Sequence, residues 1–275
     1  MLKTVCTYLN REGITLLAPV LLRDCRITRP YLLDRAGIAD GTAILFAVPY
    51  ATREADEGNV SAYAAVRDYH IFFRELFDSL LPSLRTRFPD HRFAGFADHS
   101  PIDEIHAALI AGLGVRGDNG LLLTELYSSY VFIGEIITDA ILPTSPVTPG
   151  ECLHCGLCRR ACPVSLDKSQ CLSALTQKKG DLTEEEYARL DAHPLVWGCD
   201  SCQRTCPYTA TALKRGTIYD TPSFFREQLC PTLTVEHLDL MDEETFRSRA
   251  YSWRGRAVIR RNLLRKEDLS KDQKS

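Results

Sequence analysis

Residues 152–163 of this chain read CLHCGLCRRACP, and residues 199–207 read CDSCQRTCP. The first run has the C-x2-C-x2-C-x3-C-P spacing of bacterial ferredoxins. In that pattern three cysteines ligate one cubane cluster, and the fourth, before proline, ligates a second cluster. Two [4Fe–4S] clusters need eight thiolates, which the two runs and one cysteine between them supply: Cys152, Cys155, Cys158, Cys162, Cys171, Cys199, Cys202 and Cys206. We therefore predict two clusters that transfer single electrons in sequence.

Disulfides and zinc are the alternatives for so dense a set of cysteines. The opening MLKTVCTYLNREGITLL does not have the form of a signal peptide, because Arg11 and Glu12 interrupt its apolar residues. A cytosolic chain of this size does not need disulfides. Zinc sites use paired cysteines, whereas here a quartet occurs beside a C-x2-C-x3-C-P partner. Three cysteines fit neither run and are expected to be small, mostly buried apolar residues: Cys6, Cys25 and Cys230.

The composition indicates an ordinary globular protein of 275 residues, with 45% hydrophobic and 25% charged residues. This length allows one large domain or two modest ones. No apolar stretch approaches the roughly twenty uninterrupted residues that span a bilayer. We therefore expect a cytoplasmic protein without a membrane partner.

Alternating strand and helix patterns indicate a three-layer α/β domain over residues 1–142. The expected strands are 41–49, 92–97, 120–124 and 130–137, and the expected helices are 61–81 and 102–113. Pro82 is expected to end the first helix because proline removes a helical hydrogen bond. Leu142–Glu151, with three prolines, is expected to be an extended linker.

The ferredoxin-like domain is placed at residues 143–208, and a helical C-terminal segment at 209–275. A charged helical insertion interrupts the cysteine region, with Thr183 as its expected N-cap. Residues 247–266 contain eight Arg or Lys and no acid, interleaved with Tyr251 and Trp253. Such a basic patch is typical of a phosphate-contacting surface. A solvated helix face packed against acidic segments explains it equally well.

Four segments carry a resemblance to a known enzyme family. They are SAYAAVRDYH at 61–70, DHSP at 98–101, AGLGVRGDNGLLL at 111–123 and WGCDSCQRTCP at 197–207, and CLSALT at 171–176 adds to them. They resemble epoxyqueuosine reductase, a cobalamin- and iron–sulfur-dependent enzyme of tRNA queuosine synthesis. In the glycine turn, Val115 and Asp118 stand where the family usually has tryptophan and lysine. The family's Gly-rich N-terminal segment has no counterpart before residue 40.

The resemblance implies a cobalamin-binding domain of the nitroreductase-like and reductive-dehalogenase-like type, followed by the double-cluster domain. It implies that Asp98 is the proton donor. The residues that it places against cobalamin are Asp98, Leu122, Ile133, Cys199 and Asp200. Burial beside the corrin would raise the pKa of Asp98, as a proton donor at neutral pH requires. From the sequence alone, Asp98 also fits a helix N-cap, and Leu122 and Ile133 fit ordinary core positions. Asp68 and His70 lie on a helix that could face the same pocket.

Three functions remain open at this point. The first is a cobalamin-dependent reductase that resolves an epoxide on tRNA, in the anticodon region, with electrons from a small ferredoxin- or flavodoxin-type protein. The second keeps the cofactors and acts on a different small substrate, in the manner of reductive dehalogenases; the altered glycine turn favours it. The third is a non-catalytic electron-transfer ferredoxin, which leaves the α/β domain unexplained.

Overall fold

The computed structural model describes residues 1–145 and 147–272, which form two compact units. Unit 1 consists of residues 1–49, 69–155 and 207–222. Unit 2 consists of residues 50–68 and 156–206, and of the described residues from 223 onward. Each unit is described below by itself. Residue 146 of the expected linker and residues 273–275 of the expected helical segment lie outside the described residues.

These units combine segments that are far apart in the chain, unlike the consecutive boundaries expected after residues 142 and 208. Residues 50–68 belong to unit 2 because their backbone forms hydrogen bonds with other segments of that unit. Ser61 N–H donates to Trp197 O at 2.8 Å, and Asp68 N–H donates to Ser248 O at 2.8 Å. Residues 207–222 belong to unit 1, where Arg215 pairs with Glu125 at 2.9 Å. Long-range backbone pairing of this kind leaves no local sequence pattern.

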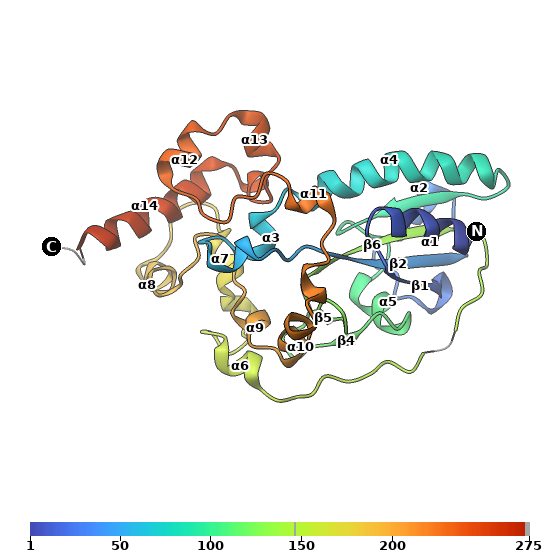
Figure 1. The fold of residues 1–275 in the computed structure, drawn as a ribbon, viewed down its shortest axis with the longest axis horizontal. Coiled ribbons are helices and arrows are strands. Elements are labelled where there is room, and N and C mark those ends of the chain that lie inside the picture. Colours follow the sequence, from blue (N-terminus) through green and yellow to red (C-terminus); the bar gives the residue numbers. More distant parts are fainter. Residues whose placement is uncertain (146, 273–275) are drawn as a thin grey trace. The chain divides into compact units, whose positions relative to one another are not determined.

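Unit 1 is built on a four-stranded sheet (Figure 1). In their order across the sheet, the strands are β1 (Leu16–Leu21), β2 (Thr42–Pro49), β6 (Val131–Thr138) and β3 (Phe93–Phe96). All neighbouring strands pair antiparallel. A second antiparallel pair joins β4 (Val115–Arg116) to β5 (Leu122–Leu123). The strands at 41–49, 92–97 and 130–137 are confirmed, and the antiparallel pairing makes the unit an α+β structure.

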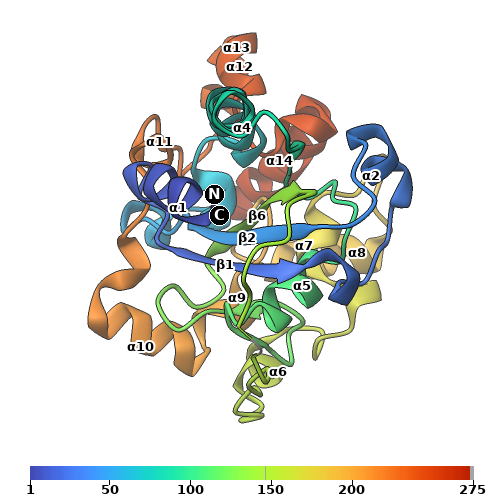
Figure 2. The ribbon, with the colours of Figure 1, turned by 90° about the vertical axis from the view of Figure 1, so that its right-hand side faces the viewer.

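Helices cover both faces of this sheet. The helices of unit 1 are α1 (Leu2–Arg11), α2 (Pro30–Ala36), α4 (Tyr69–Arg87), α5 (Glu104–Ile110) and α10 (Pro207–Arg215), with the short 3-10 turns η1 (Leu22–Asp24) and η4 (Thr217–Tyr219). Figure 2 shows α4 and α5 on opposite sides of the strands.

The two faces follow from the alternation of side chains along each strand. On one face, Leu45 and Ile137 pack with Ala107 of α5. On the other, the rings of Phe46 and Phe73 of α4 lie 6.0 Å apart. Gly134 permits this second contact, because a Cβ there would collide with Phe73. The three-layer prediction is therefore confirmed for unit 1.

The expected helix over 61–81 was wrong in two respects. It is broken into α3 (Ala62–Ala65) of unit 2 and α4 of unit 1, because Arg67 makes a β-bridge with Arg249 instead of continuing the helix. Pro82 lies inside α4 and does not end it. A proline inside a helix costs about 3 kcal/mol, and the buried side chains of Leu80 and Leu84 on either side of it offset that cost.

Unit 2 is mainly helical. Its helices are α3, α6 (Leu157–Ala161), α7 (Leu172–Thr176), α8 (Glu184–Ala192), α9 (Ser201–Arg204), α11 (Ser223–Arg226), α12 (Val235–Leu240), α13 (Glu243–Arg247) and α14 (Arg256–Asp272), with the 3-10 turns η2 (Glu54–Glu57), η3 (Lys168–Gln170) and η5 (Ser252–Arg254). The N-cap prediction at Thr183 is confirmed: Thr183 and Glu186 form a capping box at the start of α8.

The described residues contain no helix that is long and apolar enough to cross a membrane. The proline-rich segment after β6 has neither helix nor strand at its described positions, as predicted. Its Val147 packs over Gly112, whose φ of +80° suits a residue without a Cβ.

Candidate functional site

None of the eleven cysteines forms a disulfide in the structure. Cys152 and Cys155 belong to unit 1, and the other six predicted cluster ligands belong to unit 2. Cysteine thiols in the ferredoxin spacing are the donor set that iron–sulfur clusters require. The residues present therefore fit two clusters, and the assignment of each ligand stays a prediction.

In unit 2, short helices position the cysteines. Cys158 lies within α6 and Cys162 follows its last residue, while Cys202 lies within α9, against which α6 packs. Cys171 is the N-cap of α7 and interacts electrostatically with Cys199. Burial raises the pKa of the Cys199 thiol. Because a metal binds the thiolate, cluster assembly would displace that proton.

The turn before Cys199 is held by hydrogen bonds within unit 2. Gly198 has φ +74° and donates its N–H to Thr176 Oγ1 at 2.9 Å. The Nε2–H of the buried His193 donates to Gly198 O at 2.9 Å. Burial also lowers the pKa of His193, which keeps this ring neutral. His193 thus fixes the cysteine turn through its backbone.

Asp200 connects the second cysteine run to residues 50–68. Its carboxylate is buried, accepts the N–H of Ala62 at 2.8 Å, and accepts from Gln203 Nε2 at 3.2 Å. Burial raises the pKa of Asp200. These contacts give the side chain a structural role; its place beside cobalamin stays a prediction.

In unit 1, the start of the first cysteine run, residues 152–155, lies beside the altered glycine turn. His154 Nδ1 lies 2.8 Å from Asp118 Oδ1, and ligand atoms of Asp118, Cys152 and His154 lie within 4.8 Å of one another. The carboxylate that stands where the family usually has lysine thus binds a histidine of the cluster segment. Since Cys152 belongs to the ferredoxin run, we assign no separate metal to this group.

Asp98 lies in the loop that follows β3 in unit 1. Its Oδ2 is 3.7 Å from Nε2 of His70, near the start of α4, and its side chain is 67% exposed. The interaction with His70 lowers the pKa of Asp98. The alternative of a helix cap is wrong, because Asp103 caps α5 by accepting the N–H of His106 at 3.1 Å. The carboxylate of Asp98 is therefore available to a ligand.

Two glutamates behind this loop were not found from the sequence. The N–H of Asp98 donates to Glu104 Oε1 at 2.8 Å, and Ser100 Oγ donates to Glu135 Oε1. Burial raises the pKa of Glu104 to about 7. Burial, reinforced by Glu104, raises the pKa of the fully buried Glu135 well above its usual range. Glu135 could have been noticed in the sequence, because it is the single acidic residue in the otherwise apolar strand VFIGEIIT.

Leu122 and Ile133 contribute their side chains to the core under α5. Leu122 is 4% exposed, and the half-buried Ile133 packs against the same cluster. The two positions are thus core residues, and a contact with cobalamin through their backbone stays a prediction. Asp68, expected beside His70, belongs to unit 2, whereas His70 belongs to unit 1.

The basic side chains of 247–266 are largely bound within unit 2. Arg265 pairs with Asp191 of α8 at 2.6 Å, and Lys266 donates to the carbonyls of Leu190, Asp191 and His193. Arg261 donates to the carbonyls of Lys178 and Gly180.

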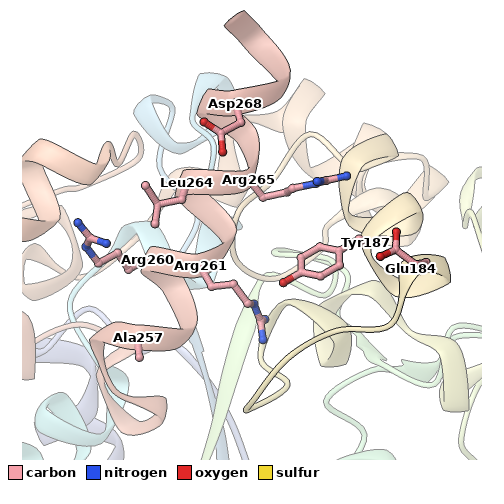
Figure 3. A pocket seen from close by; sticks show the side chains of 8 residues that line it. All are labelled: Glu184, Tyr187, Ala257, Arg260, Arg261, Leu264, Arg265 and Asp268. Carbon is pink, nitrogen blue, oxygen red and sulfur yellow. The ribbon is translucent and has the colours of Figure 1, made fainter. Parts of the chain in front are cut away.

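On the other side of α14, Arg260 pairs with Asp239 at 3.0 Å, and Arg256 donates to Leu238 O and Met241 O. Figure 3 shows Arg261 and Arg265 directed toward α8 and Arg260 directed away from it, around a pocket of about 600 Å³. These contacts favour the packed-helix explanation over a free phosphate-contacting surface.

The family model described as "Epoxyqueuosine reductase QueG, DUF1730" matches residues 40–99. A curated relative from Listeria monocytogenes serovar 1/2a, "Epoxyqueuosine reductase", is 34% identical over 245 residues, which are 81% of this chain and 62% of that protein. A relative of the same name from Gloeobacter violaceus is 30% identical over 80% of this chain and 71% of its own length. The chain thus spans less than two thirds of the Listeria protein's length.

The fold is also that of solved epoxyqueuosine reductases. One such structure, of the enzyme "with a tRNA-TYR epoxyqueuosine-modified tRNA stem loop", has a TM-score of 0.75 at 23% identity and covers 96% of this chain and 80% of its own. The residues that the family model matches include Asp98. The chain belongs to the epoxyqueuosine reductase family.

Proposed function

We propose that the chain is a cobalamin-dependent iron–sulfur reductase that converts an epoxide on tRNA to the alkene. The observation that carries the proposal is the set of eight cysteines in two ferredoxin-like runs, none of them in a disulfide. It occurs in a chain whose relatives are named epoxyqueuosine reductases. The tRNA substrate is supported by the solved relative with a bound stem loop.

The reaction adds two electrons and two protons to the epoxide and releases the oxygen as water. The eight cysteines would hold two [4Fe–4S] clusters, which would supply one-electron transfer from a ferredoxin- or flavodoxin-type donor. Cobalamin, when bound, supplies a low-valent cobalt able to deliver the electron pair. Asp98, Leu122, Ile133, Cys199 and Asp200 are the residues proposed to contact it.

Asp98 donates a proton to the leaving oxygen in this proposal. Without a ligand, the pKa of Asp98 is held low by His70. In this proposal the carboxyl becomes protonated when a bound ligand removes water from around it, because desolvation disfavours the charged form. His70 at 3.7 Å is placed to return a proton to Asp98 after each turnover.

Anaerobic reconstitution with iron, sulfide and cobalamin, followed by metal analysis, tests the cofactors. Turnover of epoxyqueuosine in an anticodon stem-loop tests the substrate. Iron and cobalt at full occupancy without turnover would reject the tRNA epoxide and favour the second candidate, a small oxidised substrate. The second candidate is favoured by Asp118, which stands where the family usually has lysine and which pairs with His154. If the reconstituted protein contained iron but no cobalt, only the third candidate, a non-catalytic electron-transfer protein, would remain.

A further inference from the structure

The backbone of Asp98 has an uncommon conformation. Its φ of +63° lies in the left-handed region, which costs a residue with a side chain about 1 kcal/mol or more. Such a conformation persists only where surrounding contacts impose it. The contacts at Asp98 therefore show what holds its carboxylate in place.

Glu104 supplies the contact to the Asp98 backbone itself. Its Oε1 accepts the Asp98 N–H at 2.8 Å. An acid in the first turn of a helix ordinarily interacts with the helix N-terminus, but in α5 Asp103 performs that capping. The carboxylate of Glu104 is thus directed to the loop and not to its own helix.

The residues after Asp98 are anchored separately. Arg29 Nη1 donates to Ser100 O at 2.9 Å, and Ser100 Oγ donates to the buried Glu135. Tyr31 Oη lies 2.9 Å from His99 Nε2. These bonds hold the far end of the loop, so the Glu104 bond fixes the rotation of the Asp98 backbone that aims its side chain at His70.

We propose that Glu104 is the positioning residue for Asp98: its carboxylate holds the Asp98 backbone in the left-handed conformation that presents the Asp98 side chain to His70 and to substrate. An effect of Glu104 on catalysis rests on the proposed function of Asp98 as proton donor. Its effect on the backbone of Asp98 does not depend on that function and can be measured separately.

The charge of Glu104 changes near neutral pH. Glu104 interacts electrostatically with the acids Asp98, Asp103 and Glu135 and with the cation Arg29. His70 and His99 interact in the same way with Asp98. Burial outweighs Arg29 and raises the pKa of Glu104 to about 7. An ionised carboxylate accepts a stronger hydrogen bond than a neutral one, so the Asp98 loop is held more firmly above this pH than below it.

Hydrogen–deuterium exchange of the Asp98 amide in the reconstituted protein tests the positioning directly. Glu104→Ala removes the acceptor and is expected to speed exchange at Asp98 about tenfold. Glu104→Gln keeps a carbonyl acceptor and is expected to remain within about threefold of wild type. Asp103→Asn is the matched control, because asparagine also caps helices. Unchanged exchange in Glu104→Ala, with iron content intact, would overturn the proposal.

Steady-state kinetics test the catalytic consequence. Glu104→Ala is expected to lower kcat with little change in KM, and Glu104→Gln to restore most of kcat while losing the wild-type inflection near pH 7. Equal losses of kcat in both variants would contradict a hydrogen-bonding role. If Asp98→Asn turns over normally while exchange responds to Glu104→Ala, the proposed function of Asp98 fails and the positioning stands.

Discussion

Nε2 of His70 lies 3.7 Å from Oδ2 of Asp98, so a helix start and a loop after a strand bring an acid and a base together. The interaction with His70 lowers the pKa of Asp98 and so favours the ionised form of its carboxyl group.

Replacing Asp98 with asparagine removes the proton while preserving the shape of the side chain. We expect Asp98→Asn to lower kcat by about 100-fold or more, the usual contribution of a general acid. Iron and cobalt contents should match wild type. Single-turnover reduction of the modified stem-loop measures the effect, and exposed Asp90→Asn is the control. Full activity in Asp98→Asn would remove this residue from the chemistry.

The buried carboxyl pair makes stability fall as pH rises. The pKa of Glu104 is raised to about 7, and that of Glu135 is also raised. Their stabilising contribution is therefore complete below their unfolded pKa of about 4.3 and is lost as pH rises through the folded values. One such group changes the free energy of unfolding by at most about 1.4 kcal/mol per pH unit.

Glu104→Gln is accordingly expected to flatten the decline in stability between pH 5 and pH 7. Glu135→Gln should be more stable than wild type at the high end of that range, because glutamine fills the site without the cost of burying a group that is ionised in the unfolded chain. Urea midpoints at both pH values measure this. A Glu104→Gln variant with the same pH slope as wild type would contradict the raised pKa.

The cysteine assignment predicts a selective loss of iron. Cys155→Ser is expected to remove or weaken one cluster and lower bound iron by up to about half, since each [4Fe–4S] cluster uses four ligands. Cys25→Ser should retain full iron, because Cys25 packs in the core of unit 1. Iron analysis and absorbance after anaerobic reconstitution distinguish them; equal loss in both would contradict the assignment.

Asn262 is expected to matter more than the arginines around it. It is fully buried, and its amide donates to Thr176 O at 2.8 Å and Val196 O at 2.9 Å. Asn262→Leu would leave both carbonyls unpaired and lower the free energy of unfolding by about 2–4 kcal/mol. Water screens the exposed pair of Arg260 and Asp239, so Arg260→Ala should change little in the same denaturation experiment.

Local patterns predicted what depends on local chemistry. The cysteine spacing, the Thr183 capping box and the strand at 130–137 follow from residues close together in the chain. The break after α3 could not be predicted, because Arg67 pairs with Arg249, a partner far along the sequence. The prediction that Pro82 ends the helix was wrong for a related reason. The burial of the apolar side chains of α4 outweighs the loss of the backbone hydrogen bond that proline cannot donate.

The candidate site shows the same division. Asp98 was found through its motif, whereas Glu104 was not, because its partner is a backbone N–H that every residue carries. The basic stretch at 247–266 was ambiguous because charge alone does not reveal whether acids and carbonyls already neutralise it. Contacts such as Arg265 with Asp191 resolved this.

The chain passes between the two units at residues 49/50, 68/69, 155/156, 206/207 and 222/223. Cutting it once at any of these points separates segments that one unit needs, so neither unit corresponds to a fragment that a gene could gain or lose by a single exchange. A truncation at any one of these points would therefore leave either the sheet of unit 1 or the helical unit 2 without one of its segments.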